Sequence, residues 1–341
     1  MDARWQWPND QPQRLLDAFR NRTNIHAFLI TGAQGVGKRT LARLYAQTIL
    51  CEAEPAARPC GACGSCVRFA RGSHPDVRSI EPGGNRSNII SVDAVRACTD
   101  ALQRQSYEGG AKIAVIIGAD FMNVQAQNAL LKTLEEPPGD CVFFLTAQRR
   151  MEILPTIRSR CAWVPLSPLS IGRAEHTLNL YGLSRSEARE AAEYSGGAMG
   201  VALRYPQEIK PVRLRVERAL LMVRSAEGIV AAAKELQAII DERADAERQL
   251  RWLLLLDILE FIARDGMDKS VDIDSAESNA ATQSQPLLER ISRASVRTRL
   301  GLLDAVSDAR RRLSMHISGT VIIESLLFDW ANMRRGSISS S

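Results

Sequence analysis

The sequence of 341 residues lacks a long hydrophobic run. Its most apolar stretch extends from Trp252 to Ile262, but Asp257 and Glu260 interrupt it. Because a membrane-spanning helix needs about 20 apolar residues, this pattern excludes a transmembrane span. The start, MDARWQWPND, also lacks a basic segment followed by an apolar one, which argues against a secretory signal. We therefore expect a cytoplasmic protein with no membrane partner.

Neither sign of charge is in large excess, since 44 lysines and arginines stand against 39 acidic residues. This balance suits a nucleic-acid partner but does not require one. The cysteines number seven, and four of them are crowded between Cys51 and Cys66. Disulfides are rare in a reducing compartment, so the crowding indicates a metal site.

Four cysteines have the spacing C-x8-C-x2-C-x2-C, namely Cys51, Cys60, Cys63 and Cys66. Zinc binds four thiolates in a tetrahedron, and Gly61 and Gly64 allow the tight turns that bring such thiolates together. Four protein ligands leave no open coordination position, so we expect a structural zinc site. An accidental grouping is the alternative. The remaining cysteines, Cys98, Cys141 and Cys161, are expected to be buried or incidental.

The first half of the chain alternates between strand and helix patterns. Short apolar runs predict strands at Ala27–Thr31, Val77–Ile80, Lys112–Ile117 and Cys141–Leu145. Helical periodicity predicts helices at Lys38–Leu50, Ser91–Gln103 and Asn123–Glu136. Strands separated by helices imply a parallel sheet that is covered on both faces.

The second half has no strand pattern. Helices are expected around Gly196 and Gly197, and long amphipathic helices follow at Val212–Arg224, Ile229–Ile240, Asp245–Arg264, Val296–Leu313 and Gly319–Trp330. The segment Val271–Gln285 predicts a mobile loop. We therefore expect an α/β domain at 1–168, a small helical lid at 169–207 and a helical domain at 208–341.

A glycine-rich segment follows the first strand and resembles a phosphate loop. Gly32, Gly37 and Lys38 match G-x-x-x-x-G-K, with Gly35 inside the loop. Such loops hold phosphates with backbone N–H groups and the lysine, while a serine or threonine holds Mg²⁺. Here Arg39 occupies that hydroxyl position, and Thr40 follows it. The strand-loop-helix fold is therefore expected, but activity is not.

Hydrolysis also requires acidic residues at the end of a neighbouring strand. The third predicted strand is followed by Ile117, Gly118 and Ala119, with Asp120 farther along, where a role as a cap or turn residue is favoured over metal binding. Mg²⁺ would have few ligands, so ATP hydrolysis should be negligible. ATP binding through Lys38 and the loop amides stays open.

Longer motifs surround these segments. They are His26-Ala27, Gly72-Ser73-His74-Pro75-Asp76, the run Asn128–Pro138 (NALLKTLEEPP) and the run Leu154–Cys161 (LPTIRSRC). Together with the cysteine module, they resemble the bacterial clamp-loader subunits of the AAA+ superfamily. The resemblance covers most of the first 205 positions and is weaker after residue 208.

Two branches of this family differ in their nucleotide site. Gamma/tau subunits are ATPases, whereas delta-prime subunits often have a degenerate site. Arg39, Ile117 and Gly118 depart from the ATPase pattern, as does Gly200, where an ATPase would carry an arginine. These departures and the chain length favour the delta-prime branch, with an ATP-hydrolysing gamma/tau-like subunit as the alternative.

The resemblance also implies roles for single residues. Ser159 and Arg160 belong to an S-R-C motif whose arginine is presented across a subunit interface to a neighbour's ATP. A guanidinium there neutralises charge that develops on the transferred phosphoryl group. A plain surface arginine is the alternative. Thr146 matches the first sensor position and, without hydrolysis, is expected to be a structural hydroxyl.

The implied function is loading of the sliding clamp onto primed DNA. The chain would join gamma/tau ATPase subunits and the delta subunit in a hetero-oligomeric ring, with residues 208–341 as the collar, and would act with the clamp and primer-template DNA through that ring. The apolar faces of the collar helices fit ring contacts and an internal core equally well. A zinc-dependent DNA-binding module is a weaker alternative, because nothing resembles a base-reading helix.

Overall fold

The computed structural model describes residues 25–82, 89–223, 225–242, 245–268, 296–315 and 317–336. The chain divides into two compact units, one ending at Leu203 and the other beginning at Arg204. The finer division into domains 1–168, 169–207 and 208–341 stays a prediction. The predicted loop at 271–285 lies outside the described residues.

The first unit contains a sheet of five parallel strands in the order β2-β3-β4-β1-β5. The strands are β1 (Ala27–Thr31), β2 (Val77–Ile80), β3 (Lys112–Ile116), β4 (Cys141–Ala147) and β5 (Ala162–Pro165). All residues of β1, β3 and β4 are buried, as expected of parallel strands with helices on both faces. The parallel α/β sheet is thereby confirmed, and β5 is a strand that the sequence patterns did not predict.

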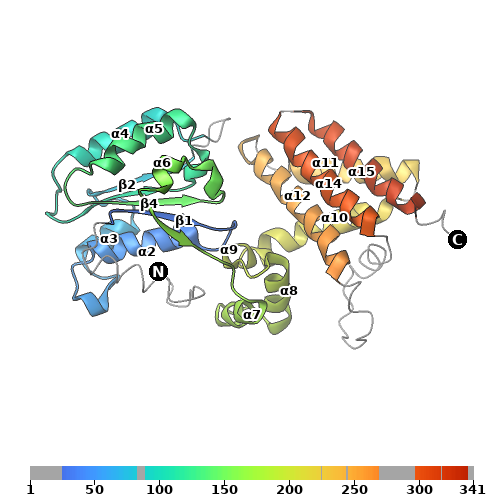
Figure 1. The fold of residues 1–341 in the computed structure, drawn as a ribbon. Helices are drawn as coiled ribbons and strands as arrows, with labels where there is room; N and C mark the ends of the chain where they lie inside the picture. The colour runs from blue at the N-terminus through green and yellow to red at the C-terminus, as the bar shows by residue number, and fades with distance from the viewer. Residues whose placement is uncertain are drawn as a thin grey trace. The chain divides into compact units, whose positions relative to one another are not determined.

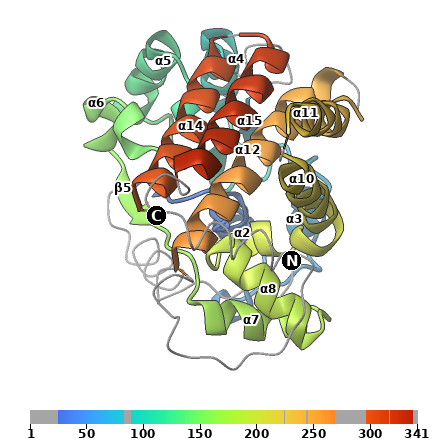
Figure 2. The same ribbon diagram turned by 90° about the vertical axis from the view of Figure 1, so that its right-hand side faces the viewer.

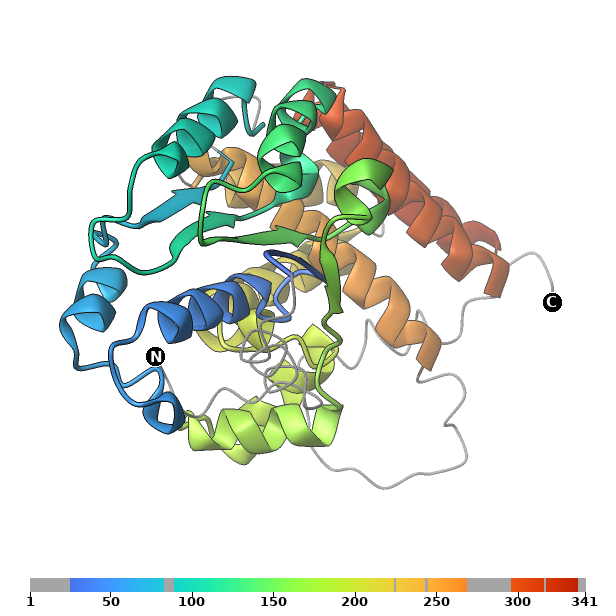
Figure 3. The same ribbon diagram turned by 60° about the vertical axis from the view of Figure 1, so that its left-hand side comes forward.

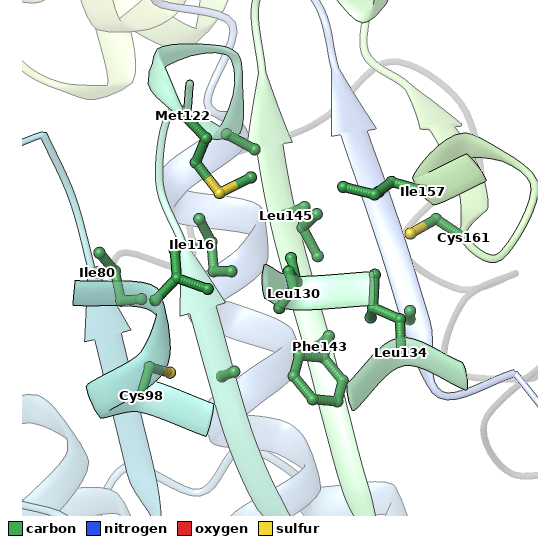
Figure 4. Close-up of a cluster of buried hydrophobic side chains, with 14 of the residues drawn as sticks. Ile80, Cys98, Ile116, Met122, Leu130, Leu134, Phe143, Leu145, Ile157 and Cys161 are labelled. Atoms are coloured by element: carbon green, nitrogen blue, oxygen red, sulfur yellow. The ribbon is translucent and has the colours of Figure 1, made fainter. Parts of the chain in front are cut away.

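Helices cover both faces of this sheet (Figures 1 and 3). One face carries α2 (Lys38–Leu50) and α3 (Gly64–Ala70), and the other carries α4 (Val92–Gln103), α5 (Val124–Glu135) and α6 (Pro155–Arg158). Each face has its own core. Phe144 packs into the core on the α2 side, whereas Phe143 lies in the opposite one with Leu130 and Leu145 (Figure 4). Successive residues of β4 thus stabilise both layers.

Local capping fixes several helix ends. Asn123 Oδ1 accepts the backbone N–H of Ala126 at 2.8 Å, and Ser91 Oγ accepts that of Ala94 at 3.2 Å. Such caps satisfy N–H groups that have no partner within the helix. Three more helices end the first unit: α7 (Ile171–Leu180), α8 (Arg185–Ser195) and α9 (Met199–Ala202). Between α8 and α9 the chain turns at Gly196 and Gly197, as the sequence indicated.

The second unit is a bundle of helices (Figure 2). A π-helical turn at Tyr205–Ile209 leads into α10 (Lys210–Met222), α11 (Ala226–Asp241), α12 (Asp245–Asp268), α14 (Val296–Ser314) and α15 (Gly319–Gly336). All five predicted long helices are present. Among the described helices, none combines the length and the apolar composition that crossing a bilayer requires.

Candidate nucleotide site and metal centre

The predicted phosphate loop joins β1 to α2. Gly35 and Gly37 have φ angles of 79° and 95°, which favour glycine because it has no Cβ. Gly37 caps the N-terminus of α2, and Lys38 is the first residue of that helix. The loop thus has the strand-turn-helix form that binds phosphate in other proteins. Gly32 and the half-buried Thr40 lie at its two ends.

The ammonium group of Lys38 is turned back onto its own loop. Its Nζ donates hydrogen bonds of 2.7 Å to the carbonyl oxygens of Gly32 and Ala33. Burial lowers the pKa of Lys38, and the nearby carboxylate of Asp120 opposes that shift. In an occupied phosphate loop this lysine reaches the terminal phosphates. Here the loop carbonyls take the place of those phosphate oxygens.

Arg39, at the position of the metal-binding hydroxyl, points to the end of β2. Its guanidinium forms an ion pair with Glu81, and both side chains are more than half exposed. A guanidinium cannot ligate Mg²⁺, because it has donors and no acceptor. The ion pair also neutralises the Glu81 carboxylate with a cation of the chain itself.

The end of β3 is held by hydrogen bonds where an ATPase would carry its acidic pair. The backbone N–H of Gly118 donates to Thr146 Oγ1 at 2.9 Å, and Thr146 is buried at the end of β4. Asp120 Oδ2 accepts the backbone N–H groups of Gln148 and Arg149 at 3.0 and 3.2 Å. Both polar side chains thus fix the loops that follow β3 and β4.

Helix α9 lies directly on the phosphate loop. The backbone N–H of Gly200 donates to the carbonyl oxygen of Gly35 at 2.8 Å. A Cβ at Gly200 would lie 2.9 Å from that same oxygen, which is closer than real Cβ contacts. Val201 packs with Val36 and Ala198 in the core on the α2 side. The position where an arginine is expected in an ATPase is therefore a close contact between two backbones.

The four predicted metal ligands come together in space. The sulfur atoms of Cys51, Cys60, Cys63 and Cys66 all lie within 4.8 Å of one another, and Cys51 Sγ is 3.9 Å from Cys63 Sγ. Sulfurs bound tetrahedrally to zinc at about 2.3 Å would be about 3.8 Å apart. The cluster therefore fits a zinc ion held by four cysteines.

Backbone N–H groups point at these sulfurs. Cys63 N–H donates to Cys60 Sγ at 3.3 Å, and Cys66 N–H donates to Cys63 Sγ at 3.4 Å. The first of these bonds is the main cause that lowers the pKa of Cys60 to about 6, whereas burial raises the pKa of Cys66 to about 12. Because zinc takes thiolate ligands, its binding would displace the proton of Cys66.

A buried network ties this cysteine module to the sheet. His74 Nδ1 accepts the backbone N–H of Asp76 at 3.2 Å, so the proton lies on Nε2, which is 2.9 Å from Ser65 Oγ in α3. The Asp76 carboxylate accepts three hydrogen bonds from residues 106–108, just before β3. In the sequence, both residues belong to the motif at 72–76, but that motif alone indicates no role for either of them.

Arg160 lies on the surface beside the edge strand β5. Its Nη2 forms an ion pair of 2.6 Å with Glu135 Oε1 at the end of α5, and its side chain is 36% exposed. Its Nη1 donates to the carbonyl oxygen of Thr156 at 3.0 Å. Ser159 Oγ donates to that same oxygen, also at 3.0 Å. Two contacts thus fix the guanidinium while leaving it accessible.

Buried Gln127 supports the segment that carries this arginine. Its Nε2 donates to the carbonyl oxygens of Met122 and Glu152 at 3.1 and 3.0 Å, and its Oε1 accepts the N–H of Leu154 at 2.8 Å. Leu154 directly precedes α6. The only sequence signal for this role is a polar residue, Gln127, at a position that the helical pattern places on the apolar face of α5.

Comparison with known proteins gives a consistent result. A family model described as DNA polymerase III, delta subunit, matches residues 8–170. The chain is similar to DNA polymerase III subunit delta' of Pseudomonas aeruginosa, with 43% identity over 138 residues, or 40% of this chain and 42% of that protein. It is also similar to subunit delta' of Yersinia pestis, with 30% identity over 267 residues, or 75% of this chain and 76% of that protein. The first of these matches spans less than half of the relative's length.

A second kind of relative matches less than half of the chain. DNA polymerase III subunit tau of Bacillus subtilis is 35% identical over 147 residues, which cover 43% of this chain and 25% of that protein. The delta' match of Yersinia pestis extends over 75% of this chain and 76% of its own, whereas the tau match covers 43% and 25%. The extent of the likeness therefore places the chain with the delta' subunits.

Proposed function

The chain belongs to the family of DNA polymerase III delta' subunits, and from this premise we propose that it is a non-hydrolysing subunit of a clamp loader. In this role it supports ATP-dependent loading of the sliding clamp onto primed DNA, in the cytoplasm. It joins gamma/tau ATPase subunits and a delta subunit in a ring, and it completes a neighbour's active site with Arg160.

The observation that carries the non-hydrolysing role is the contact between α9 and the phosphate loop. Gly200 N–H is bound to Gly35 O, and the loop carbonyls hold the Lys38 ammonium. The end of β3, which β4 separates from β1 in the sheet, presents Ile117 and Gly118, neither of which has a side chain that can ligate a metal. In-line attack on a triphosphate needs a bound Mg²⁺ and a positioned water. The side chains of these residues can neither bind the metal nor orient the water.

The proposed role of zinc is structural. Four cysteine ligands would fill every position of a tetrahedral site, so no position would be left for water or substrate. The buried hydrogen bonds of His74 and Asp76 then connect the module to β2 and to the segment before β3. The metal would fix the folded form of residues 51–66 and take no part in phosphate chemistry.

The role of Arg160 rests on its exposure and its setting. A guanidinium on an accessible edge of the first unit can reach a nucleotide held by another subunit, where it would neutralise charge in the transition state. Arginine suits this task because it stays protonated and offers several N–H groups in one plane.

The test compares ATP turnover by the purified chain with turnover by the gamma/tau and delta subunits, with and without this chain, on primed DNA. We expect no turnover by the chain alone and DNA-stimulated turnover by the complete assembly. Turnover by the isolated chain would support the alternative of a gamma/tau-like ATPase.

Arg160→Ala tests the arginine in the same assembly. Arginine fingers contribute about 10³–10⁵ in rate at the site they complete, so we expect the neighbouring site to lose its DNA-stimulated turnover. Arg185→Ala is the matched control, because that side chain is 93% exposed on α8. Equal turnover in the two variants would remove the role of Arg160.

A further inference from the structure

The guanidinium of Arg160 makes two polar contacts, one through each of its terminal nitrogens. Nη2 pairs with Glu135 Oε1 at 2.6 Å, and Nη1 donates to Thr156 O at 3.0 Å. An arginine has five N–H donors. Among the described residues these contacts use two of them, so Nε–H and one hydrogen on each terminal nitrogen are left for a phosphate.

The two partners come from different elements. Thr156 belongs to α6, only four residues before the arginine, whereas Glu135 is the last residue of α5. The Glu135 contact therefore fixes the side chain against a second helix, and it restricts motions that the α6 contact alone would allow. Glu135 is 48% exposed, so it lies on the same accessible surface.

The ion pair between Glu135 and Arg160 is expected to contribute little to the stability of the fold. A carboxylate in the last turn of a helix faces the negative end of the helix dipole, which favours cations there. Ion pairs between exposed side chains contribute little, because water screens them and the side chains lose freedom. Removing the Glu135 carboxylate should therefore change the position of the Arg160 side chain more than the stability of the fold.

We propose that Glu135 is a positioning residue that pre-orients Arg160 for the nucleotide of the neighbouring subunit. This inference rests on the proposed function of Arg160. A free arginine side chain must lose rotational freedom before it can contact a phosphate, and that loss opposes the transition state. The ion pair restricts this freedom in advance, and the donors that it does not use are left for a phosphate.

The test uses the assembled complex of this chain with its ATPase and delta partners on primed DNA. Turnover is normalised to the amount of complex isolated by gel filtration. We expect Glu135→Ala to lower kcat by about three- to tenfold, since a displaced catalytic group can lose up to about 10²-fold in rate. The KM for ATP should not change, because the neighbour binds ATP with its own residues. Glu135→Gln, which keeps a hydrogen-bond acceptor, should fall between wild type and alanine.

The matched control is Glu136→Ala. It removes the same charge from the same helix end, and among the described residues the ion pair of Arg160 is with Glu135 and not with Glu136. We expect wild-type turnover from this variant. Reduced turnover in it would assign the effect to charge alone and overturn the positioning role.

A double variant separates this inference from the proposed function. In the Arg160→Ala background, Glu135→Ala should cause no further loss. If Arg160→Ala itself leaves turnover unchanged, the proposed role of the arginine fails. If Arg160→Ala lowers turnover but Glu135→Ala does not, or if the two losses multiply, the role of Arg160 stands and the positioning role of Glu135 is wrong.

Discussion

Replacing Gly200 by alanine tests whether α9 lies directly on the phosphate loop. The added Cβ would lie 2.9 Å from the carbonyl oxygen and 3.2 Å from the Cα of Gly35. Both are backbone atoms that cannot rotate away, so α9 or the loop must shift. That shift would also lengthen the 2.8 Å hydrogen bond from Gly200 N–H to Gly35 O.

The expected size follows from two opposing effects. An extra methyl group forced into a packed site destabilises a protein by about 1–3 kcal/mol. Alanine in place of glycine within a helix recovers roughly 0.5–1 kcal/mol. The net loss is therefore roughly 0–2.5 kcal/mol, which corresponds to a fall in Tm of up to about 10 °C for a unit of this size.

The assay is thermal and urea unfolding of the purified chain, with Gly172→Ala in α7 as the matched control. A Cβ at Gly172 meets no described heavy atom within 4 Å, so we expect an unchanged or slightly higher Tm. The difference between the two variants isolates the contact with the loop. Equal unfolding curves would show that α9 does not pack on the phosphate loop, and the main support for the non-hydrolysing role would be lost.

Two further predictions concern the metal centre and the end of β4. Cys66→Ser should lower the zinc content measured by elemental analysis from one per chain, whereas Cys98→Ala, which lies outside the cluster, should retain it; full zinc in the first variant would contradict the four-cysteine site. Thr146→Val should leave the Gly118 N–H unsatisfied and destabilise the chain by about 1–3 kcal/mol. The same variant should not change the partner's ATP turnover once the complex has assembled, and a loss of turnover there would return a sensor role to Thr146.

Local patterns predicted the parts of the molecule that depend on near neighbours in sequence. The buried strands β1, β3 and β4 are short apolar runs between turn formers, and the four cysteines lie within a short segment whose spacing fixes their geometry. Strand β5 was not predicted because it ends in Pro165, and a proline weakens the strand pattern of so short a run.

Contacts between distant segments were beyond sequence reasoning. Gly200 marked a missing arginine by resemblance, but only the fold brings it against Gly35, which is 165 positions away. In the same way, a role for Arg160 was predicted from the S-R-C motif. Its ion pair with Glu135, however, depends on how α5 and α6 pack. Neither contact leaves a periodic or spacing signal in the chain.

The ammonium group of Lys38 is bound by carbonyl oxygens of its own loop, which lowers the affinity that the loop would have for a triphosphate. A triphosphate that entered the loop would first have to break two hydrogen bonds from the Lys38 ammonium to carbonyl oxygens, each 2.7 Å long. Hydrogen bonds to charged groups contribute about 1.5–3 kcal/mol each, so breaking both would weaken binding by about 10²–10⁴-fold before new contacts offset the loss. The guanidinium of Arg160 is less fully compensated, because within the part of the chain that the structure describes its two contacts leave three N–H donors unused. Under the proposed function, the phosphate loop would therefore bind a nucleotide weakly, and the unused donors of Arg160 would contact a nucleotide held by another subunit.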